Sequence, residues 1–263
     1  MSIVASSPAA KNSPCISPQC FSAGKAWTYC LFPFASAIVI ASFLLATIAD
    51  AQQTQLKRYD LYVGFADLNS PALGLNQTGL HTQFGVNVRE WYALGFDYSV
   101  SRGSTVLKPD LLPVTLQEQL APLILAYIQA GVVPPTYQLK LPAHIMTQSF
   151  AAGPQFSYRH FRRVTLFVRP SVGAFRLAAT LHPADPLATE VSQLLAPSNP
   201  TVDWTGFYGF GGGDEILLTP HFGVRSQMDV VYNHPFNDIL ANGFWTMRYS
   251  VGLNIHAGKN ILK

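Results

Sequence analysis

The chain is poor in charge, and its positive and negative residues nearly balance. Of its 263 residues only 12% are charged, and the formal net charge is +3. So small a positive excess argues against nucleic-acid binding as the main role. With 49% hydrophobic and 12% aromatic residues, the composition also excludes a disordered chain. The length allows one large domain or two small ones.

Cysteine and long apolar runs are both confined to the N-terminal segment. Only Leu31 to Ile48 is apolar for long enough to form a membrane-spanning helix, and all three cysteines precede it. Two lysines lie before this run, and the small residues Ala49 and Ala51 follow it. This layout predicts a secretory signal peptide at 1–51, with an uncleaved anchor as the alternative. The exported chain would then contain no cysteine, which excludes disulfides and thiol chemistry.

After Lys57 the hydrophobic pattern has a period of two. In 80–89, for example, Leu80 and Phe84 alternate with His81 and Gln83. The pattern recurs in blocks about as long as a tilted strand needs to cross a membrane, roughly 9 to 11 residues. The blocks lie at about 59–66, 80–89, 92–100, 143–159, 163–175, 203–213, 220–231 and 242–256. We therefore predict an all-β fold over 52–263, a closed, up-and-down antiparallel barrel of eight strands.

The size of the residues on the two faces predicts which face points outward. A barrel of eight strands has an interior just wide enough for side chains to fill. Here the polar face is rich in Gly, Ala and Ser, whereas the apolar face carries bulky aromatic residues. The bulky face is therefore expected outside, against lipid, as in a transmembrane barrel. The alternative is a soluble periplasmic ligand-binding barrel with the faces reversed.

The links between blocks alternate in length. Long links are expected at 67–79, 101–142, 176–202 and 232–241, and short ones at 89–90, 160–162 and 214–219. Outer-membrane barrels have this alternation, with the long links extracellular. Apolar residues at helical spacing predict short helices in two of the long links, at 116–127 and from Asp185-Pro186 to Leu195. Such helices would pack on the protein, lie on the membrane, cover the barrel mouth or bind a partner.

Several motifs resemble a known family. They are GPQFSYRH, the strand FVRPSVGAF, the glycine-rich GFGGGDEILLTPHFGVRSQMDVVY and the closing RYSVGLNIHAG. Together they resemble the eight-stranded barrel domain of the OmpA-like superfamily, over residues 57–258. The closing strand departs from the family pattern, because Ile255 stands where an aromatic residue is usual and residues 256–263 trail behind it.

The resemblance implies that Arg225, Gln227 and Asp229 point into the lumen. It also implies a location in the outer membrane of a double-membraned bacterium. The partners it implies are outer-membrane lipid and lipopolysaccharide, together with the barrel assembly machinery during insertion. The external ligand is left open.

The polar face supplies the candidate site. Isolated buried charges are costly, so charges inside a narrow barrel must pair or contact water. We predict a lumen polar network that plugs the barrel, with a thin pore as the alternative. Its members are Arg89, Asp97, Arg159, Arg169, Asp203, Arg225, Gln227, Asp229 and Arg248.

No catalytic, cofactor or metal site is predicted. The seven histidines lack H-E-x-x-H or cysteine partner spacing, and turn or rim positions would explain most of them. Gly211 to Gly213 precede no Lys-Ser/Thr pair, so close packing is a simpler reading than a phosphate loop. The expected role is structural or surface-interactive. A minor channel for small solutes and a lipid-modifying enzyme with His and Ser on its outer face are the alternatives.

Overall fold

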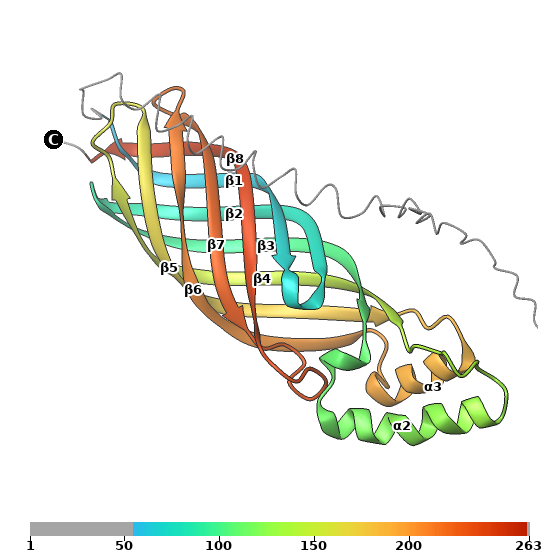
Figure 1. Cartoon of the computed structure of the whole chain (residues 1–263). Coiled ribbons are helices and arrows are strands. Elements are labelled where there is room, and N and C mark those ends of the chain that lie inside the picture. The colour runs from blue at the N-terminus through green and yellow to red at the C-terminus, as the bar shows by residue number, and fades with distance from the viewer. Residues whose placement is uncertain (1–54, 262–263) are drawn as a thin grey trace, which may run out of the picture. The chain divides into compact units, whose positions relative to one another are not determined.

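The computed structural model describes residues 55–261 as eight antiparallel strands in one closed barrel (Figure 1). The strands are β1 (Lys57–Ser70), β2 (Leu75–Arg89), β3 (Tyr92–Leu107), β4 (Leu141–Tyr158), β5 (Val164–Leu181), β6 (Thr201–Leu217), β7 (Phe222–Asn233) and β8 (Phe244–Asn260). Each strand pairs with the next along the chain, and β8 pairs with β1. The predicted up-and-down barrel is confirmed. The predicted signal segment at 1–51 lies outside the described residues.

The two faces of the strands have the predicted characters. Phe65 and Leu253 point outward and are 54% and 56% exposed, whereas Tyr62 and His81 point inward and are fully buried. Because side chains alternate along a strand, this assignment of faces holds around the ring. No helix within residues 55–261 is both long and apolar enough to cross a bilayer.

The strands are longer than the sequence pattern predicts. β4 and β5 each contain 18 residues, whereas a tilted strand needs roughly 9 to 11 to cross a membrane. Near the long links the outer face also becomes polar, as at Arg102 and Ser104 on β3. The alternation that located the blocks therefore fades there, although the hydrogen-bonded ladder continues.

The prediction of a long first link at 67–79 is wrong. β1 continues to Ser70 and β2 begins at Leu75, so only 71–74 connect them. These residues form the short 3₁₀ helix η1 (Pro71–Leu73), which ends at Gly74. Gly74 has a φ of +57°, in the left-handed region that glycine enters without steric cost. A tight turn thus replaces the expected loop.

At the short-turn end of the barrel, two strands also extend beyond their predicted bounds. β6 continues to Leu217, so Glu215 pairs with Arg225 of β7 instead of lying in a turn. β8 continues to Asn260, so His256 pairs with Asp60 of β1 instead of trailing. These extensions bring further charged side chains into the interior.

The helices predicted in the long links are confirmed. The link from β3 to β4 contains the 3₁₀ helix η2 (Pro109–Leu111) and α2 (Val114–Gln129), and the link from β5 to β6 contains α3 (Pro186–Leu195). Asp185 caps α3, because its Oδ1 accepts a hydrogen bond of 2.7 Å from the backbone N–H of Ala188. α2 and α3 lie together at the long-link end of the barrel (Figure 1). Leu120 of α2 and Leu187 and Val191 of α3 belong to one apolar cluster, so these helices pack on the protein.

The seam between β1 and β8 closes through two facing glycines. Gly64 of β1 pairs with Gly252 of β8. A Cβ atom at Gly252 would lie 2.2 Å from the Cα atom of Gly64, and one at Gly64 would lie 2.2 Å from Tyr62 Oη. Neither position has room for a larger residue, and the buried Tyr62 ring fills the space beside them.

Candidate functional site

Four charged side chains meet at the centre of the barrel. They are Asp97 of β3, Arg169 of β5, Asp229 of β7 and Arg248 of β8, and all are at least 94% buried. Arg169 donates through Nη2 to both oxygens of Asp229, at 2.8 Å each, and its Nη1 lies 2.5 Å from Asp97 Oδ2. Arg248 Nη2 donates to Asp229 Oδ2 at 2.8 Å and lies 3.3 Å from Asp97 Oδ1. Two positive and two negative groups thus form a neutral central cluster.

Hydroxyl, amide and imidazole groups surround the central cluster. His81 Nε2 lies 2.5 Å from Asp97 Oδ1, and His81 Nδ1 lies 2.9 Å from Ser250 Oγ. Arg248 Nη1 donates to the hydroxyl oxygens of Ser99 and Ser149 at 3.1 and 3.0 Å. Each arginine is therefore held by more than one strand. This matters because a buried charge needs hydrogen bonds to its remaining donors as well as a counter-ion.

A second cluster lies toward the short-turn end of the barrel, and we call it simply the second cluster. The ring of His256 bridges two carboxylates, with Nδ1 2.7 Å from Asp60 Oδ1 and Nε2 2.6 Å from Glu215 Oε1. Arg225 Nε lies 3.9 Å from Glu215 Oε2, and its guanidinium carbon lies 4.2 Å from the centre of the Phe167 ring. These groups are also buried.

Amide side chains extend each of the two clusters. Arg225 donates to Gln83 Oε1 at 3.0 Å and to Gln155 Oε1 at 3.2 Å. Gln227 Nε2 lies 3.0 Å from His81 Nδ1. Gln83 and Gln155 therefore belong to the contacts of Arg225, whereas Gln227 belongs to the contacts around the central cluster.

Close approach at Gly211 makes room for the central cluster. A Cβ atom at this position would lie 1.9 Å from Asp229 Oδ1. Any other residue would therefore displace the carboxylate that both arginines contact. This agrees with the prediction that the glycine run serves close packing.

Six of the predicted network residues lie in the buried interior, five in or beside the central cluster and one, Arg225, in the second cluster. They are Asp97, Arg169, Arg225, Gln227, Asp229 and Arg248. Arg159 lies just beyond β4 and donates to Asn87 Oδ1 at 3.2 Å and to the carbonyl oxygen of Glu90. It therefore borders the second cluster.

Two predicted members lie outside the network. Arg89 is exposed at the end of β2, where a register shift between Asn87 and Arg89 interrupts the pairing. Asp203 lies near the start of β6, where its Oδ2 accepts a 2.5 Å hydrogen bond from the backbone N–H of Phe236. It holds the link before β8 and does not reach the centre.

Four interior groups were missed, namely His81, Asp60, Glu215 and His256. His81 and Asp60 stand on the polar faces of their predicted blocks, so the alternation could have identified them. Glu215 lies beyond the predicted block 203–213, and His256 is the last residue of the block 242–256, where it was expected to begin the trailing residues.

Little open space remains between these polar groups. One cavity beside Gln83, Gln155 and Arg225 and another beside Asp97 and Arg169 hold about 10 Å³ each. A single water needs roughly 10 to 15 Å³, so each cavity accommodates about one water. Within residues 55–261, no group of three or more His, Cys, Asp or Glu side chains is arranged to hold a metal ion.

Searches with this chain found no matching protein-family model and no matching curated protein. Three solved structures are similar to it, each at 11% sequence identity. The attachment invasion locus protein Ail of Yersinia pestis has a TM-score of 0.43, over 77% of this chain and 100% of Ail. Neisserial surface protein A has a TM-score of 0.45, over 76% and 96%. The outer membrane protein OprG from Pseudomonas aeruginosa has a TM-score of 0.42, over 80% and 100%.

Proposed function

We propose that the chain is an integral outer-membrane protein, with residues 1–51 as its signal peptide and 52–263 as its barrel domain. The exterior supports this proposal, because every strand presents a large apolar side chain that is 39% to 64% exposed. These are Leu61, Leu80, Leu94, Phe156, Val168, Phe210, Phe222 and Leu253. Soluble proteins rarely expose so continuous an apolar surface, and a closed barrel leaves no unpaired strand edge in hydrocarbon.

Aromatic residues near both ends of the barrel support two membrane interfaces. Trp91, in a short turn, stacks on Phe156 with ring centroids 6.2 Å apart. Trp204 and Trp245 stand near the starts of β6 and β8, at the long-link end. Aromatic girdles of this kind flank the apolar band of outer-membrane barrels. The surroundings are then outer-membrane lipid and lipopolysaccharide, and the barrel assembly machinery is the partner during insertion.

The same proposal assigns the lumen a structural role and not a conducting one. The observation that carries it is the neutral central cluster of Asp97, Arg169, Asp229 and Arg248, which contacts four strands. A pore needs a continuous water-filled path, whereas here guanidinium and carboxylate groups occupy the axis. The long links and their helices are then the part available to surface partners.

Conductance in planar bilayers tests the plug. The wild-type protein should give no discrete current steps. The charge-balanced double variant Arg169→Ala with Asp229→Ala should open a water path and give steps. The matched control changes the neighbouring outward residues, Val168→Ala with Met228→Ala, and should stay silent. A heat-modifiability gel verifies folding. Wild-type steps as large as those of the interior variant would overturn the plug and favour a small-solute channel.

One observation favours a second function, lipid modification. Ser104 Oγ lies 2.8 Å from His144 Nδ1 on the outer face of β3 and β4, the pair of groups that a serine nucleophile and its base require. The His144 ring contacts the His182 ring, with centroids 4.8 Å apart. Release of fatty acid from lipopolysaccharide or phospholipid by the wild type, abolished by Ser104→Ala, would favour this role. Equal release by both proteins would exclude Ser104 as the nucleophile.

A further inference from the structure

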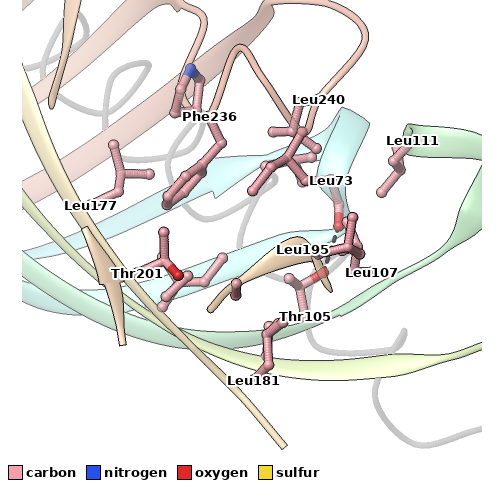
Figure 2. Close-up of a pocket in the computed structure, with 16 residues that line it drawn as sticks. Leu73, Thr105, Leu107, Leu111, Leu177, Leu181, Leu195, Thr201, Phe236 and Leu240 are labelled. Atoms are coloured by element: carbon pink, nitrogen blue, oxygen red, sulfur yellow. Dashed lines mark hydrogen bonds between the residues drawn. The ribbon is translucent and has the colours of Figure 1, made fainter. Parts of the chain in front are cut away.

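Toward the long-link end, the interior beside β4, β5 and β6 changes from ionic to apolar. Beyond the central cluster, the Phe175 and Phe207 rings stack with centroids 4.3 Å apart. Past them lies a cavity of about 70 Å³ in which apolar side chains converge (Figure 2). They come from η1, β3, β5, α3 and the link before β8, and include Leu73, Leu107, Leu177, Leu195, Phe236 and Leu240.

The hydroxyl groups that line this cavity already have partners. Thr105 Oγ1 donates to the carbonyl oxygen of Leu73 at 2.6 Å, as the dashed line in Figure 2 marks. Thr201 Oγ1 donates to the carbonyl oxygen of Ser198, also at 2.6 Å. A buried water needs two to four polar partners, and cavities without them stay dry and take apolar ligands. The chemistry of the lining therefore selects an apolar occupant.

The space itself arises from small residues among large ones. Ala143, Ala179 and Ala196 line the cavity between leucines and isoleucines. Its volume corresponds to roughly five water-sized spheres and is about half that of an engineered cavity that holds benzene. A narrow chain fits such a space better than a ring does.

We propose that this cavity, the mouth pocket, binds the end of an unbranched alkyl chain. Two sources share this chemistry, namely the acyl chain of an outer-leaflet lipid and a free amphiphile such as a short fatty acid. The mouth pocket lies between the barrel strands and the long links, so the proposal goes beyond a plugged structural barrel. It does not require a closed lumen, and the conductance test does not decide it.

Photolabelling of the folded protein in lipid nanodiscs tests the proposal. One arm uses hexanoic acid with a diazirine on its terminal carbon, and the other uses phosphatidylethanolamine with the diazirine at the end of an acyl chain. Labelled peptides should map to Leu177 and to 235–240. Labelling by the acid alone identifies a free amphiphile, and labelling by the lipid alone identifies a membrane lipid. Labelling confined to outward-facing residues in both arms would overturn the proposal.

A matched pair of variants separates the mouth pocket from general lipid contact. Ala179→Phe fills the cavity, whereas Thr180→Phe adds the same ring one residue along, on the opposite face of β5. Labelling inside the pocket should fall about fifteenfold in the first variant and stay unchanged in the second, corresponding to the loss of about two buried methylene groups at about fourfold each. Equal labelling in both variants would refute the site.

Competition in the wild-type protein keeps the proposal testable if Ala179→Phe does not fold. Unlabelled butanoate and hexanoate are added to compete with the diazirine acid. Hexanoate should compete better by about fourfold for each added methylene. Protection by hexanoate that extends equally to outward-facing peptides, or equal potency of the two acids, would contradict binding in the mouth pocket.

Discussion

The substitution Asp229→Ala probes the central cluster most directly. Asp229 is 1% exposed and accepts hydrogen bonds from Arg169 Nε and Nη2, at 3.0 and 2.8 Å, and from Arg248 Nη2, at 2.8 Å. Its removal leaves two buried guanidinium groups that share Asp97 as their carboxylate. Breaking a buried ion pair by removing one partner costs about 3 to 5 kcal/mol. We expect the free energy of unfolding to fall by that amount.

Urea unfolding of the protein in lipid vesicles, followed by tryptophan fluorescence, measures this loss. Met228→Ala is the matched control, because Met228 is the neighbouring outward residue, and it should cost less than about 1 kcal/mol. A loss below about 1 kcal/mol for Asp229→Ala would refute the view that this carboxylate holds the two arginines together.

The double variant Arg169→Ala with Asp229→Ala gives a second measure of the same contact. Removing both partners leaves no unpaired charge from this pair, so the double variant should cost less than the sum of the single ones. Residues in contact show coupling of about 0.5 to 3 kcal/mol. Strict additivity would contradict the direct contact between Arg169 and Asp229.

Three further predictions concern packing, capping and pH. Gly211→Ala should push the Asp229 carboxylate away and lower the free energy of unfolding by about 1 to 3 kcal/mol, whereas Gly206→Ala, with its nearest atom 3.9 Å away, should change urea unfolding little. Asp185→Ala removes the cap of α3, so it should cost that helix about 1 kcal/mol and speed limited proteolysis of the link without changing barrel unfolding. Burial, with the hydrogen bond to Asp185, raises the pKa of Tyr137 to about 12. Because the neutral phenol is favoured in the folded state, its stabilising contact is complete below the ordinary pKa of 10.0 and is lost as the pH rises toward 12.

Each of these three has an outcome that contradicts it. Equal losses in the two glycine variants would show that Asp229 does not need the space. Unchanged proteolysis of the link in Asp185→Ala would show that the cap does not stabilise α3. An absorbance titration of tyrosinate in which wild type and Tyr137→Phe differ only below pH 10 would contradict the raised pKa.

The middle of the barrel could be predicted from sequence, because alternation directly reports which side of a strand a residue occupies. Asp97, Arg169, Asp229 and Arg248 stand mid-strand on the polar face, and they are the residues that meet. The sequence could not rank them above Arg89, which shares the alternation but lies where the pairing shifts register.

The strand ends could not be predicted, because pairing with a neighbour decides them and not the local pattern. Glu215 is polar and follows a glycine run, which indicates a turn, yet β7 holds it in the ladder opposite Arg225. His256 is likewise held by β1. The mouth pocket could not be predicted from sequence for a related reason. Its lining comes from segments that only closure of the barrel brings together.

The glycine seam between β1 and β8 has a consequence for biogenesis. Gly64 meets Gly252, so the first and last strands of the described chain must find each other before either loses its exposed edge. Contacts between such distant positions form slowly. A chain truncated before β8 has no partner for β1, and it should stay an export intermediate that chaperones must hold, instead of inserting as a smaller barrel.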